Sequence, residues 1–322
     1  MLDSLFPGQS IDIEYKKPGF WKNKYVIRSA DQRLVCQFVR MRRAAAGLET
    51  LFRLLSGQGV AAQQLLRSGK LPHPGLHCAH YFVASYVEGQ RPTRECPKED
   101  VEAIGRELGR LHSISTHGGW GRLVRWLPLQ SGGHWRYLRG WAFQGARTLS
   151  RTADSASEAT ELRSWIEHRG AALDDVRDFR LMHGDLTAAN VLLHERRAHF
   201  IDYDMMQFGL PQHELAGCFH LPFCRGDDGT RWNALVSAYR STVPAEVFAL
   251  WERHAPLFLL LATLYWGQRR VHRAGRSNGR RDAGSIARSY WRLCRRIISD
   301  HPDGAGDWRL FPALRDSTDT AP

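Results

Sequence analysis

The sequence predicts an α+β fold, in which a small strand-rich part at the N-terminus precedes a larger, mainly helical part. Three observations support this prediction. Residues 11–40 and 81–89 contain short apolar runs and alternating apolar and polar side chains, which are typical of strands. From residue 101 onward, apolar residues recur at helical spacing. Finally, residues 181–204 form three short apolar runs joined by tight turns, as in strands connected by short loops.

The composition is that of a globular protein. The chain has 322 residues, of which 43% are hydrophobic and 24% charged, and this is enough for two lobes with a substantial core. The six cysteines are scattered without a Cys-x-x-Cys pair, which argues against a zinc site and suits a reducing cytoplasm. The first ten residues lack a basic start followed by an apolar run, so no secretion signal is expected and the predicted location is cytoplasmic.

The longest apolar run, residues 255–266, has only twelve residues. A transmembrane helix needs about 20. No membrane span is therefore predicted, and this run is expected to form a buried helix of the core.

The chain is strongly basic, with a net charge of +12. A basic surface is usually just solvated, but it can also meet an acidic partner such as a nucleotide, a phosphorylated substrate or an anionic membrane face. Ten arginines fall between residues 269 and 296, and Arg288, Arg292 and Arg295 are predicted along one helix face. Peripheral contact with an anionic surface is one interpretation of this stripe. No nucleic-acid-binding motif is visible, so nucleic acid is not an expected partner.

The predicted N-terminal strands flank a basic turn. Residues 11–15 and 25–27 are predicted strands, and residues 17–24 between them are rich in Gly, Pro and Lys. Such a turn can lay backbone amides and lysines over phosphates, although it lacks a Gly-x-Gly-x-x-Gly pattern. The next predicted elements are a strand, a helix and a strand that runs into a hinge, at residues 34–40, 48–55 and 81–89.

Most of the remaining chain is predicted to be helical. Apolar spacing predicts helices at residues 101–112, 161–173, 232–239 and 244–265, the last with a proline at its start. Residues 150–160 are small and polar and predict a loop. The segment 117–145 carries four tryptophans among arginines. It fits either a substrate-binding insert or helices that pack their tryptophans against the lobe.

Three polar side chains stand at the turns of the 181–204 region: Asp185, Asn190 and Asp202. Transfer of a phosphoryl group from ATP needs a carboxylate that orients a hydroxyl and accepts its proton, and oxygen ligands that hold Mg²⁺ against the phosphates. Carboxylate and amide oxygens are such ligands. Each residue alone would be an ordinary turn residue. The combination His-Gly-Asp-x4-Asn with Ile-Asp favours Asp185 as the base and the other two as magnesium ligands.

This region also resembles a known family. His-Gly-Asp-Leu at 183–186, with Asn190, is similar to the catalytic loop of the aminoglycoside phosphotransferase and choline kinase-like family, whose fold is that of the protein kinases. Ile-Asp-Tyr-Asp at 201–204 is similar to the family's metal-binding strand end. Residues 211–216 resemble the segment that follows, except that Glu214 replaces an Asp that usually braces the catalytic loop.

The resemblance implies a protein kinase-like two-lobed fold with ATP between the lobes. Residues 1–87 would form the nucleotide-binding lobe, residues 88–98 a hinge, and residues 99–322 the catalytic and substrate-binding lobe. The implied activity is ATP-dependent phosphorylation of a hydroxyl group on a small molecule that is aminoglycoside-, choline- or sugar-like. Its cofactors would be ATP and Mg²⁺, and its partner a small-molecule hydroxyl acceptor.

The resemblance also assigns residues to the phosphates of the nucleotide. Family members often carry a polar Asn and an aromatic residue in the turn that holds Lys22 and Asn23. On the third strand, Gln37 stands where the family has a phosphate-binding lysine. Arg40 could replace that lysine, but alternation along a strand puts Arg40 on the opposite face from Gln37. The turn residues Lys22 and Lys24 are further candidates for the missing charge.

Two acidic residues complete the expected ATP site. Glu49 lies on the predicted helix, where it is either the partner of a strand cation or an ordinary exposed residue. Glu88 resembles the end of the family's hinge, whose backbone hydrogen-bonds the adenine.

Two other functions compete with the small-molecule kinase. Gln37 would suit a non-catalytic, nucleotide-binding pseudokinase that acts as an interaction module, whereas the intact Asp185, Asn190 and Asp202 oppose it. The basic surface would suit a kinase of a lipid-linked or polysaccharide substrate.

Overall fold

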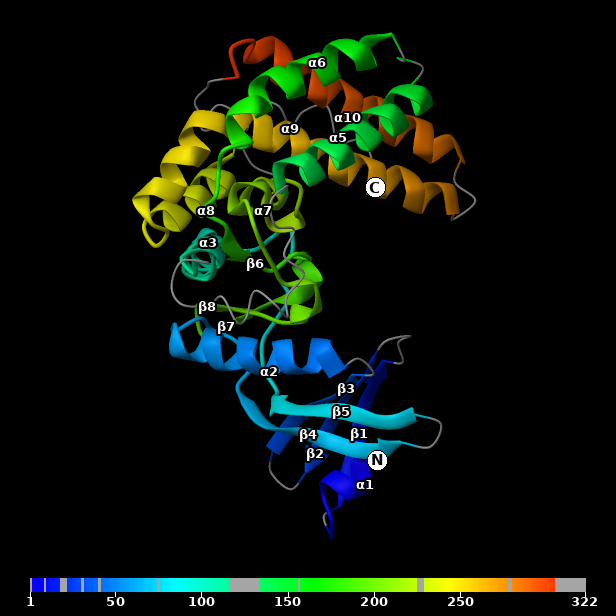
Figure 1. The fold of residues 1–322 in the computed structure, drawn as a ribbon, viewed down its shortest axis with the longest axis vertical. Helices are drawn as coiled ribbons and strands as arrows, with labels where there is room; N and C mark the ends of the chain where they lie inside the picture. Colours follow the sequence, from blue (N-terminus) through cyan, green and yellow to red (C-terminus); the bar gives the residue numbers. More distant parts are fainter. Residues whose placement is uncertain are drawn as a thin grey trace.

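The computed structural model describes residues 2–8, 10–17, 22–29, 32–39, 42–73, 76–115, 134–153, 155, 157–224, 229–276 and 280–304. The chain forms a small sheet-rich N-terminal lobe and a larger helical C-terminal lobe (Figure 1). This confirms the predicted α+β architecture. The predicted domain boundaries stay a prediction, although they fall near the end of strand β5 (Leu76–Ser85) and the start of helix α3 (Lys98–His112).

The N-terminal lobe is built on one five-stranded antiparallel sheet of order β1-β2-β3-β5-β4. Helix α1 (Leu2–Leu5) precedes it, and helix α2 (Arg42–Gly57) connects β3 to β4. The remaining strands are β1 (Ile11–Lys17), β2 (Lys22–Ser29), β3 (Gln32–Val39) and β4 (Leu65–His73). The sequence did not predict α1 or β4. Strand β4 lacks clean alternation, and its Gly69 lets the ring of Tyr81 cross over the backbone, since a Cβ there would lie 2.7 Å from the Tyr81 hydroxyl.

The two faces of this sheet are covered by different helices. One face packs against Leu5 of α1 and contains Ile27, Cys36 and other buried side chains of the central strands. On the opposite face, Lys24 pairs with Gln37, and Gln37 pairs with Phe82. Residues paired across strands share a face. Because Phe82 belongs to the same core cluster as the apolar side chains of α2, Gln37 and Lys24 lie on the face that α2 covers (Figure 1).

The segment that leaves the sheet packs directly on the C-terminal lobe. Gln90 and Leu193 exchange two backbone hydrogen bonds of 2.9 and 2.8 Å. Gly89 is needed at this contact because its φ is +150° and a Cβ would lie 2.8 Å from the Leu193 carbonyl oxygen.

The C-terminal lobe is mainly helical and carries two small antiparallel ribbons. Its helices are α3, α5 (His134–Thr152), α6 (Glu158–Gly170), α7 (Pro211–Cys218), α8 (Thr230–Arg240), α9 (Ala245–Arg276) and α10 (Arg280–Asp300). Its strands are β6 (Arg180–Met182), β7 (Val191–His194), β8 (Arg197–Phe200) and β9 (Gln207–Gly209). Short 3₁₀ helices are η1 (Ala171–Leu173), η2 (Ala188–Asn190), η3 (Tyr203–Met205) and η4 (Pro222–Cys224). Of segment 117–145, only the part from residue 134 onward, in α5, lies among the described residues.

Helix α9 contains the long apolar run and forms the centre of this lobe. Residues 257–264 are all buried, which confirms the predicted core helix. The helix kinks at His254, two residues before Pro256, because a proline removes a backbone donor and crowds the preceding turn. By length and composition α9 could cross a membrane, but 72% of its most apolar window is buried within the protein, as in a core helix.

Candidate active site

The three predicted catalytic and metal residues lie on one loop and one hairpin. Strands β7 and β8 form the hairpin, and the Ile201 N–H donates to the Asn190 carbonyl oxygen at 3.0 Å. This bond brings the two ends of the hairpin together, with Asp202 directly after Ile201. The Asn190 Nδ2 donates to the backbone oxygen of Asp185 at 2.8 Å and to its Oδ2 at 3.3 Å. The structure therefore places Asp185, Asn190 and the start of the Asp202 turn side by side.

The His183 ring links the Asp185 loop to the end of strand β8. Its ring is buried, and its Nε2–H donates to the Ile201 carbonyl oxygen at 2.9 Å. In this tautomer Nδ1 is an acceptor and faces the backbone N–H of Asp185 at 3.4 Å. The imidazole thus ties the loop to the end of β8, which is a structural role.

Glu214 of α7 braces the same loop. Its carboxylate accepts the backbone N–H groups of His183 and Gly184 at 2.8 and 2.7 Å. The same carboxylate accepts a third bond, of 3.0 Å, from Nε2 of His112, whose Nδ1 faces the Tyr239 hydroxyl at 3.1 Å. The glutamate therefore takes the bracing position in which the family more often has an aspartate.

Burial and hydrogen bonding set the charges of this brace. Burial by itself would raise the pKa of Glu214, but the His112 and His183 contacts hold that pKa below its ordinary value. Burial lowers the pKa of His112. A neutral His112 imidazole donates to Glu214 through Nε2–H and accepts from the Tyr239 hydroxyl through Nδ1. Donors and acceptors are therefore matched along the Tyr239–His112–Glu214 row of hydrogen bonds.

Two left-handed residues shape the loop. Gly184 has φ +80°, and a Cβ there would lie 1.9 Å from the backbone oxygen of Met205, so only glycine fits. Asp202 has φ 68° and ψ 57°, a conformation that aspartate tolerates better than most residues and that is common at functional sites. The next residue, Tyr203, packs edge-on against Phe52 of α2 with ring centroids 5.9 Å apart. The Asp202 turn is thereby in contact with the N-terminal lobe.

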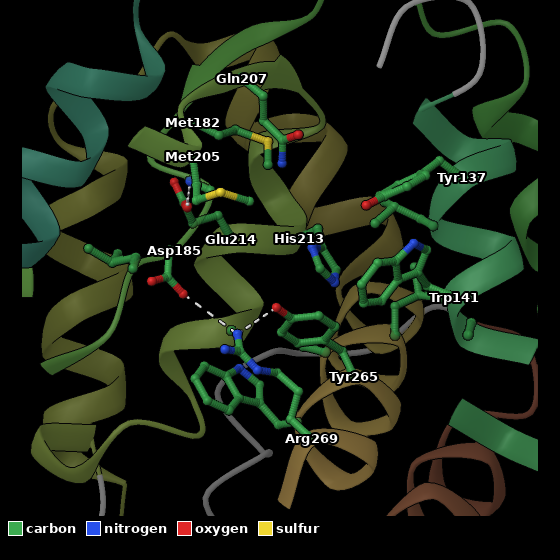
Figure 2. Close-up of a pocket in the computed structure, with 18 residues that line it drawn as sticks. Tyr137, Trp141, Met182, Asp185, Met205, Gln207, His213, Glu214, Tyr265 and Arg269 are labelled. Atoms are coloured by element: carbon green, nitrogen blue, oxygen red, sulfur yellow. Dashed lines mark hydrogen bonds and ion pairs between the residues drawn. The ribbon is translucent and has the colours of Figure 1, made fainter. Parts of the chain in front are cut away.

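Asp185 has a partner that the sequence did not predict. Its Oδ1 lies 3.6 Å from Nη1 of Arg269, which also donates to the Tyr265 hydroxyl at 2.7 Å (Figure 2). The guanidinium lies over the rings of Tyr265 and Trp266, with 5.4 and 5.6 Å to the ring centroids. In the sequence, Arg269 is one of many arginines near the C-terminus, and nothing local distinguishes it.

A cavity of about 150 Å³ opens beside Asp185 in the C-terminal lobe. Figure 2 shows Tyr137 and Trp141 of α5 on one side of it, with Asp185 and Arg269 on the other. His213 of α7 also lines it, and burial lowers the pKa of His213 to about 4. The sequence left two interpretations of segment 117–145 open. Trp135 of α5 is buried, as expected for a tryptophan that packs against the lobe. Trp141 of α5 lines the cavity, the position expected for a residue of a substrate-binding segment.

The two predicted acidic residues of the ATP site form ion pairs at the surface of the N-terminal lobe. Glu49 pairs with Arg53 one turn along α2 at 2.7 Å, as an ordinary exposed helical residue does. Glu88 pairs at 2.7 Å with Arg33 of β3, whose guanidinium also binds Glu14 and stacks on Tyr86. Glu88 thus ties the hinge to the sheet.

The remaining predicted residues are described in part. Gln37 lies half-buried on the α2 side of the sheet, opposite Lys24. Lys22 and Asn23 belong to β2, but their side chains lie outside the described part of the structure, as does all of Arg40. In the C-terminal stripe, Arg295 pairs with Glu161 of α6 at 3.1 Å, so this member is engaged within the protein.

The chain matches a known family and known folds. Residues 18–257 match the family model of the phosphotransferase enzyme family. Similar solved structures include a microcompartment-associated aminopropanol kinase (TM-score 0.58, 18% identity, 93% of this chain and 94% of that one). Another is an aminoglycoside phosphotransferase from Alicyclobacillus acidocaldarius (TM-score 0.58, 13% identity, 90% of this chain and 92% of that one). A third is a spectinomycin phosphotransferase in complex with ADP and spectinomycin (TM-score 0.55, 15% identity, 99% of this chain and 97% of that one). No curated protein matches.

At these identities the solved structures establish the fold, which is the predicted kinase-like one. The family match supports neither the pseudokinase nor the kinase of a lipid-linked or polysaccharide substrate. The chain therefore belongs to the phosphotransferase enzyme family and is a kinase of a small-molecule hydroxyl group, as its sequence predicted.

Proposed function

We propose that the chain transfers the γ-phosphoryl group of ATP to an acceptor hydroxyl that is held by Asp185. The observation that carries this proposal is the position of Asp185, which is fixed by Asn190 on one side and opens onto the cavity of the C-terminal lobe on the other. An acceptor in the cavity would meet the carboxylate, while the nucleotide would approach from the sheet.

Asp185 acts as the base that orients the acceptor. A carboxylate within hydrogen-bond reach of the hydroxyl accepts its proton as the new bond to phosphorus forms. The backbone N–H of His183 donates to Glu214, and the His183 ring donates to the Ile201 carbonyl oxygen; both bonds keep the loop rigid. Positioning requires such rigidity, because phosphoryl transfer depends mostly on placement and charge.

Asn190 and Asp202 fit a magnesium site by the chemistry of their donors. Because Nδ2 of Asn190 donates to two oxygens of Asp185, its Oδ1 is the atom that it offers to a cation. Together with an Asp202 carboxylate this gives two oxygen ligands, and Mg²⁺ usually takes only one or two from the protein, with phosphates and water as the rest. When bound, the ion would offset the charge of the phosphates.

Lys24 is the residue we assign to the missing phosphate-binding charge. It lies directly opposite Gln37 on the face that α2 covers, and paired Cβ atoms in an antiparallel sheet are about 4.5–5.5 Å apart. A lysine side chain spans that distance easily. The positive charge that the family carries on the third strand would thus be supplied by Lys24 on the second strand, β2.

The test of the base is Asp185→Asn, after a screen of hydroxyl compounds with labelled ATP has identified an acceptor. The amide keeps the size of the side chain but accepts no proton, so turnover should fall about 10²- to 10⁴-fold, while ATP affinity measured by calorimetry stays near the wild-type value. Asp282→Asn, on the exposed start of α10, is the matched control and should behave as wild type. Unchanged turnover in Asp185→Asn would refute the assignment.

The test of the metal site is Asp202→Asn. Asparagine also tolerates the left-handed conformation, so the turn should survive. We expect ATP affinity to lose its dependence on Mg²⁺, because one of the two proposed ligands becomes neutral. ATP titrations with and without Mg²⁺ measure this. If Mg²⁺ strengthens ATP binding equally in variant and wild type, the metal lies elsewhere.

A further inference from the structure

The charges that line the cavity beside Asp185 are unusual for a site that would receive a polyamine. Among the described lining residues, Arg269 is the only lysine or arginine, and Asp185 and Glu214 are the only carboxylates. Glu214 is committed to two backbone N–H groups and His112. His213, with a pKa of about 4, is uncharged at neutral pH. Among the described residues, the cavity therefore presents one guanidinium and, apart from Glu214 with its three internal partners, no carboxylate beyond the proposed base.

This charge pattern favours an acidic acceptor over a cationic one. An ammonium group on the acceptor would face Arg269 without a carboxylate to pair with. A carboxylate would instead receive parallel N–H bonds from the planar guanidinium, which is the geometry that arginine offers best. Arg269 is held in place for this by the Tyr265 hydroxyl and the ring of Trp266, and 43% of its side chain is exposed toward the cavity and solvent.

The aromatic wall favours a ring on the acceptor. Trp141 packs between Tyr137 and Tyr265 with centroid distances of 5.5 and 5.6 Å, and both Tyr137 and Trp141 are partly exposed (Figure 2). The cavity volume is about 150 Å³, and a buried cavity of roughly that size holds a benzene ring. The flat face of an aromatic ring or of a sugar ring would cover these side chains.

The short distance between the two charged side chains limits the acceptor further. Arg269 Nη1 and Asp185 Oδ1 are 3.6 Å apart. Hydrogen bonds from one acceptor to both side chains are therefore within reach of a hydroxyl and a carboxylate that are close neighbours. A 2- or 3-hydroxy acid, in which two or three carbons carry both groups, fits this arrangement.

We propose that the acceptor is a ring-bearing hydroxy carboxylate, with its carboxylate on Arg269 and its hydroxyl on Asp185. The reaction itself rests on the proposed function; the binding does not. In the transfer, the hydroxyl oxygen forms a bond to the γ-phosphorus, and the bond from that phosphorus to the β–γ bridging oxygen breaks. The electron pair of the broken bond leaves with ADP, and the hydroxyl proton goes to Asp185.

Two matched series of probes test this proposal and separate its two ring types. The aromatic series is 3-hydroxy-2-phenylpropanoate, its carboxamide and 3-amino-2-phenylpropan-1-ol. The sugar series is methyl glucuronide, methyl glucoside and methyl 6-amino-6-deoxyglucoside. Binding without nucleotide is followed by tryptophan fluorescence, and phosphorylation is followed separately with labelled ATP.

In at least one series the carboxylate should bind roughly ten- to hundredfold more tightly than the neutral and cationic members, as a hydrogen-bonded charge pair implies. That ratio should collapse in Arg269→Gln and persist in Arg273→Gln, which removes an exposed charge one turn further along α9. The ratio of affinities between the carboxylate and the other members of its series is the readout, because Arg269→Gln also removes the ion pair with Asp185. Absence of a carboxylate preference in both series, a preference for the amines, a preference that survives Arg269→Gln, or no binding at all would each overturn the proposal. Arg269-dependent binding without any phosphorylation would instead refute the proposed function alone.

Discussion

At residue 37 this chain has a neutral amide where the family pattern has a lysine, and the cross-strand register offers a substitute. Lys24 and Gln37 occupy opposite positions on β2 and β3, so exchanging them moves a positive charge by one strand without changing the face of the sheet. Both side chains are half-buried. A charge in such a partly closed place is less screened than one in water.

We predict that Lys24→Gln weakens ATP binding about tenfold or more, which corresponds to the loss of one hydrogen bond to a charged group. The double variant Lys24→Gln with Gln37→Lys should recover most of this affinity, because it restores the charge on the neighbouring strand. Calorimetric titration with ATP measures both. Lys98→Gln, on the exposed start of α3, is the control. A double variant that binds no better than Lys24→Gln would place the phosphates away from this pair.

At the scale of single elements, the conformation of the loop that carries Asp185 requires a glycine at position 184. Gly184→Ala combines a left-handed backbone with a Cβ 1.9 Å from the Met205 backbone oxygen. We expect a loss of roughly 2 kcal/mol or more in the free energy of unfolding, together with reduced turnover, because the loop must move away from Glu214. Denaturant titration and kinetics measure the two effects.

The matched control for this variant is Gly140→Ala. Gly140 lies exposed on α5, and a Cβ added there would meet no atom within 4 Å. Alanine there should stabilise the protein slightly, by about 0.5–1 kcal/mol, since glycine is the poorer helix former. If Gly184→Ala were as stable and as active as Gly140→Ala, the close approach to Met205 would not limit the loop.

Elements with a local signature were predictable, and contacts between distant segments were not. The alternation and turns of residues 181–204 predicted β6, β7, β8 and the loop with Asp185. Strand β4 was missed because its pairing with β5 includes two irregularities in register and a glycine that admits the Tyr81 ring. A strand whose partner determines its pattern leaves a weak signal in its own residues.

The same reasoning explains which site residues were found. Asp185 and Asn190 stand at fixed spacing in one motif, so their neighbourhood could be predicted. Arg269 reaches Asp185 from α9, and the contact depends on how α7, α9 and the loop pack together. The one feature near Arg269 in the sequence that relates to this contact is Tyr265, one helical turn earlier, whose hydroxyl accepts a hydrogen bond from Arg269. That spacing is common on helices and carries no information about the site.

At the scale of the whole molecule, the two lobes are joined at several separate contacts. Besides the Gln90–Leu193 bridge, the Ala61 backbone N–H donates to the buried carboxylate of Glu107 on α3. Phe52 of α2 packs on Tyr203, next to Asp202. Helix α2 therefore lies between the sheet and the turn with the proposed metal ligand, and the position of that turn depends on the packing of both lobes.

Three ionisable groups of the C-terminal lobe, the buried His112 and Glu214 and the half-buried His213, make the stability of the protein depend on pH. Burial lowers the pKa of His112 and takes that of His213 to about 4, both below the ordinary value of 6.5. In the unfolded chain these imidazoles bind protons as the pH falls below about 6.5, whereas in the folded protein they do not. The pKa of Glu214 is also lowered, so its contribution is present above its ordinary value of 4.5 and is lost at lower pH. All three groups therefore destabilise the fold on acidification.

We predict that the free energy of unfolding falls steadily from pH 7 to pH 4, by up to about 1.4 kcal/mol per pH unit for each histidine that stays neutral in the fold. His213→Gln should flatten this dependence by up to about 3 kcal/mol between pH 6.5 and 4, since it removes one group with a folded pKa of about 4. Urea titrations at pH 7, 6, 5 and 4 measure the slope. His272→Gln, at an exposed position of α9, should leave the slope unchanged. If His213→Gln kept the wild-type slope across this range, the fold would not resist protonation of His213, and the assignment of a neutral imidazole to this cavity wall would be wrong.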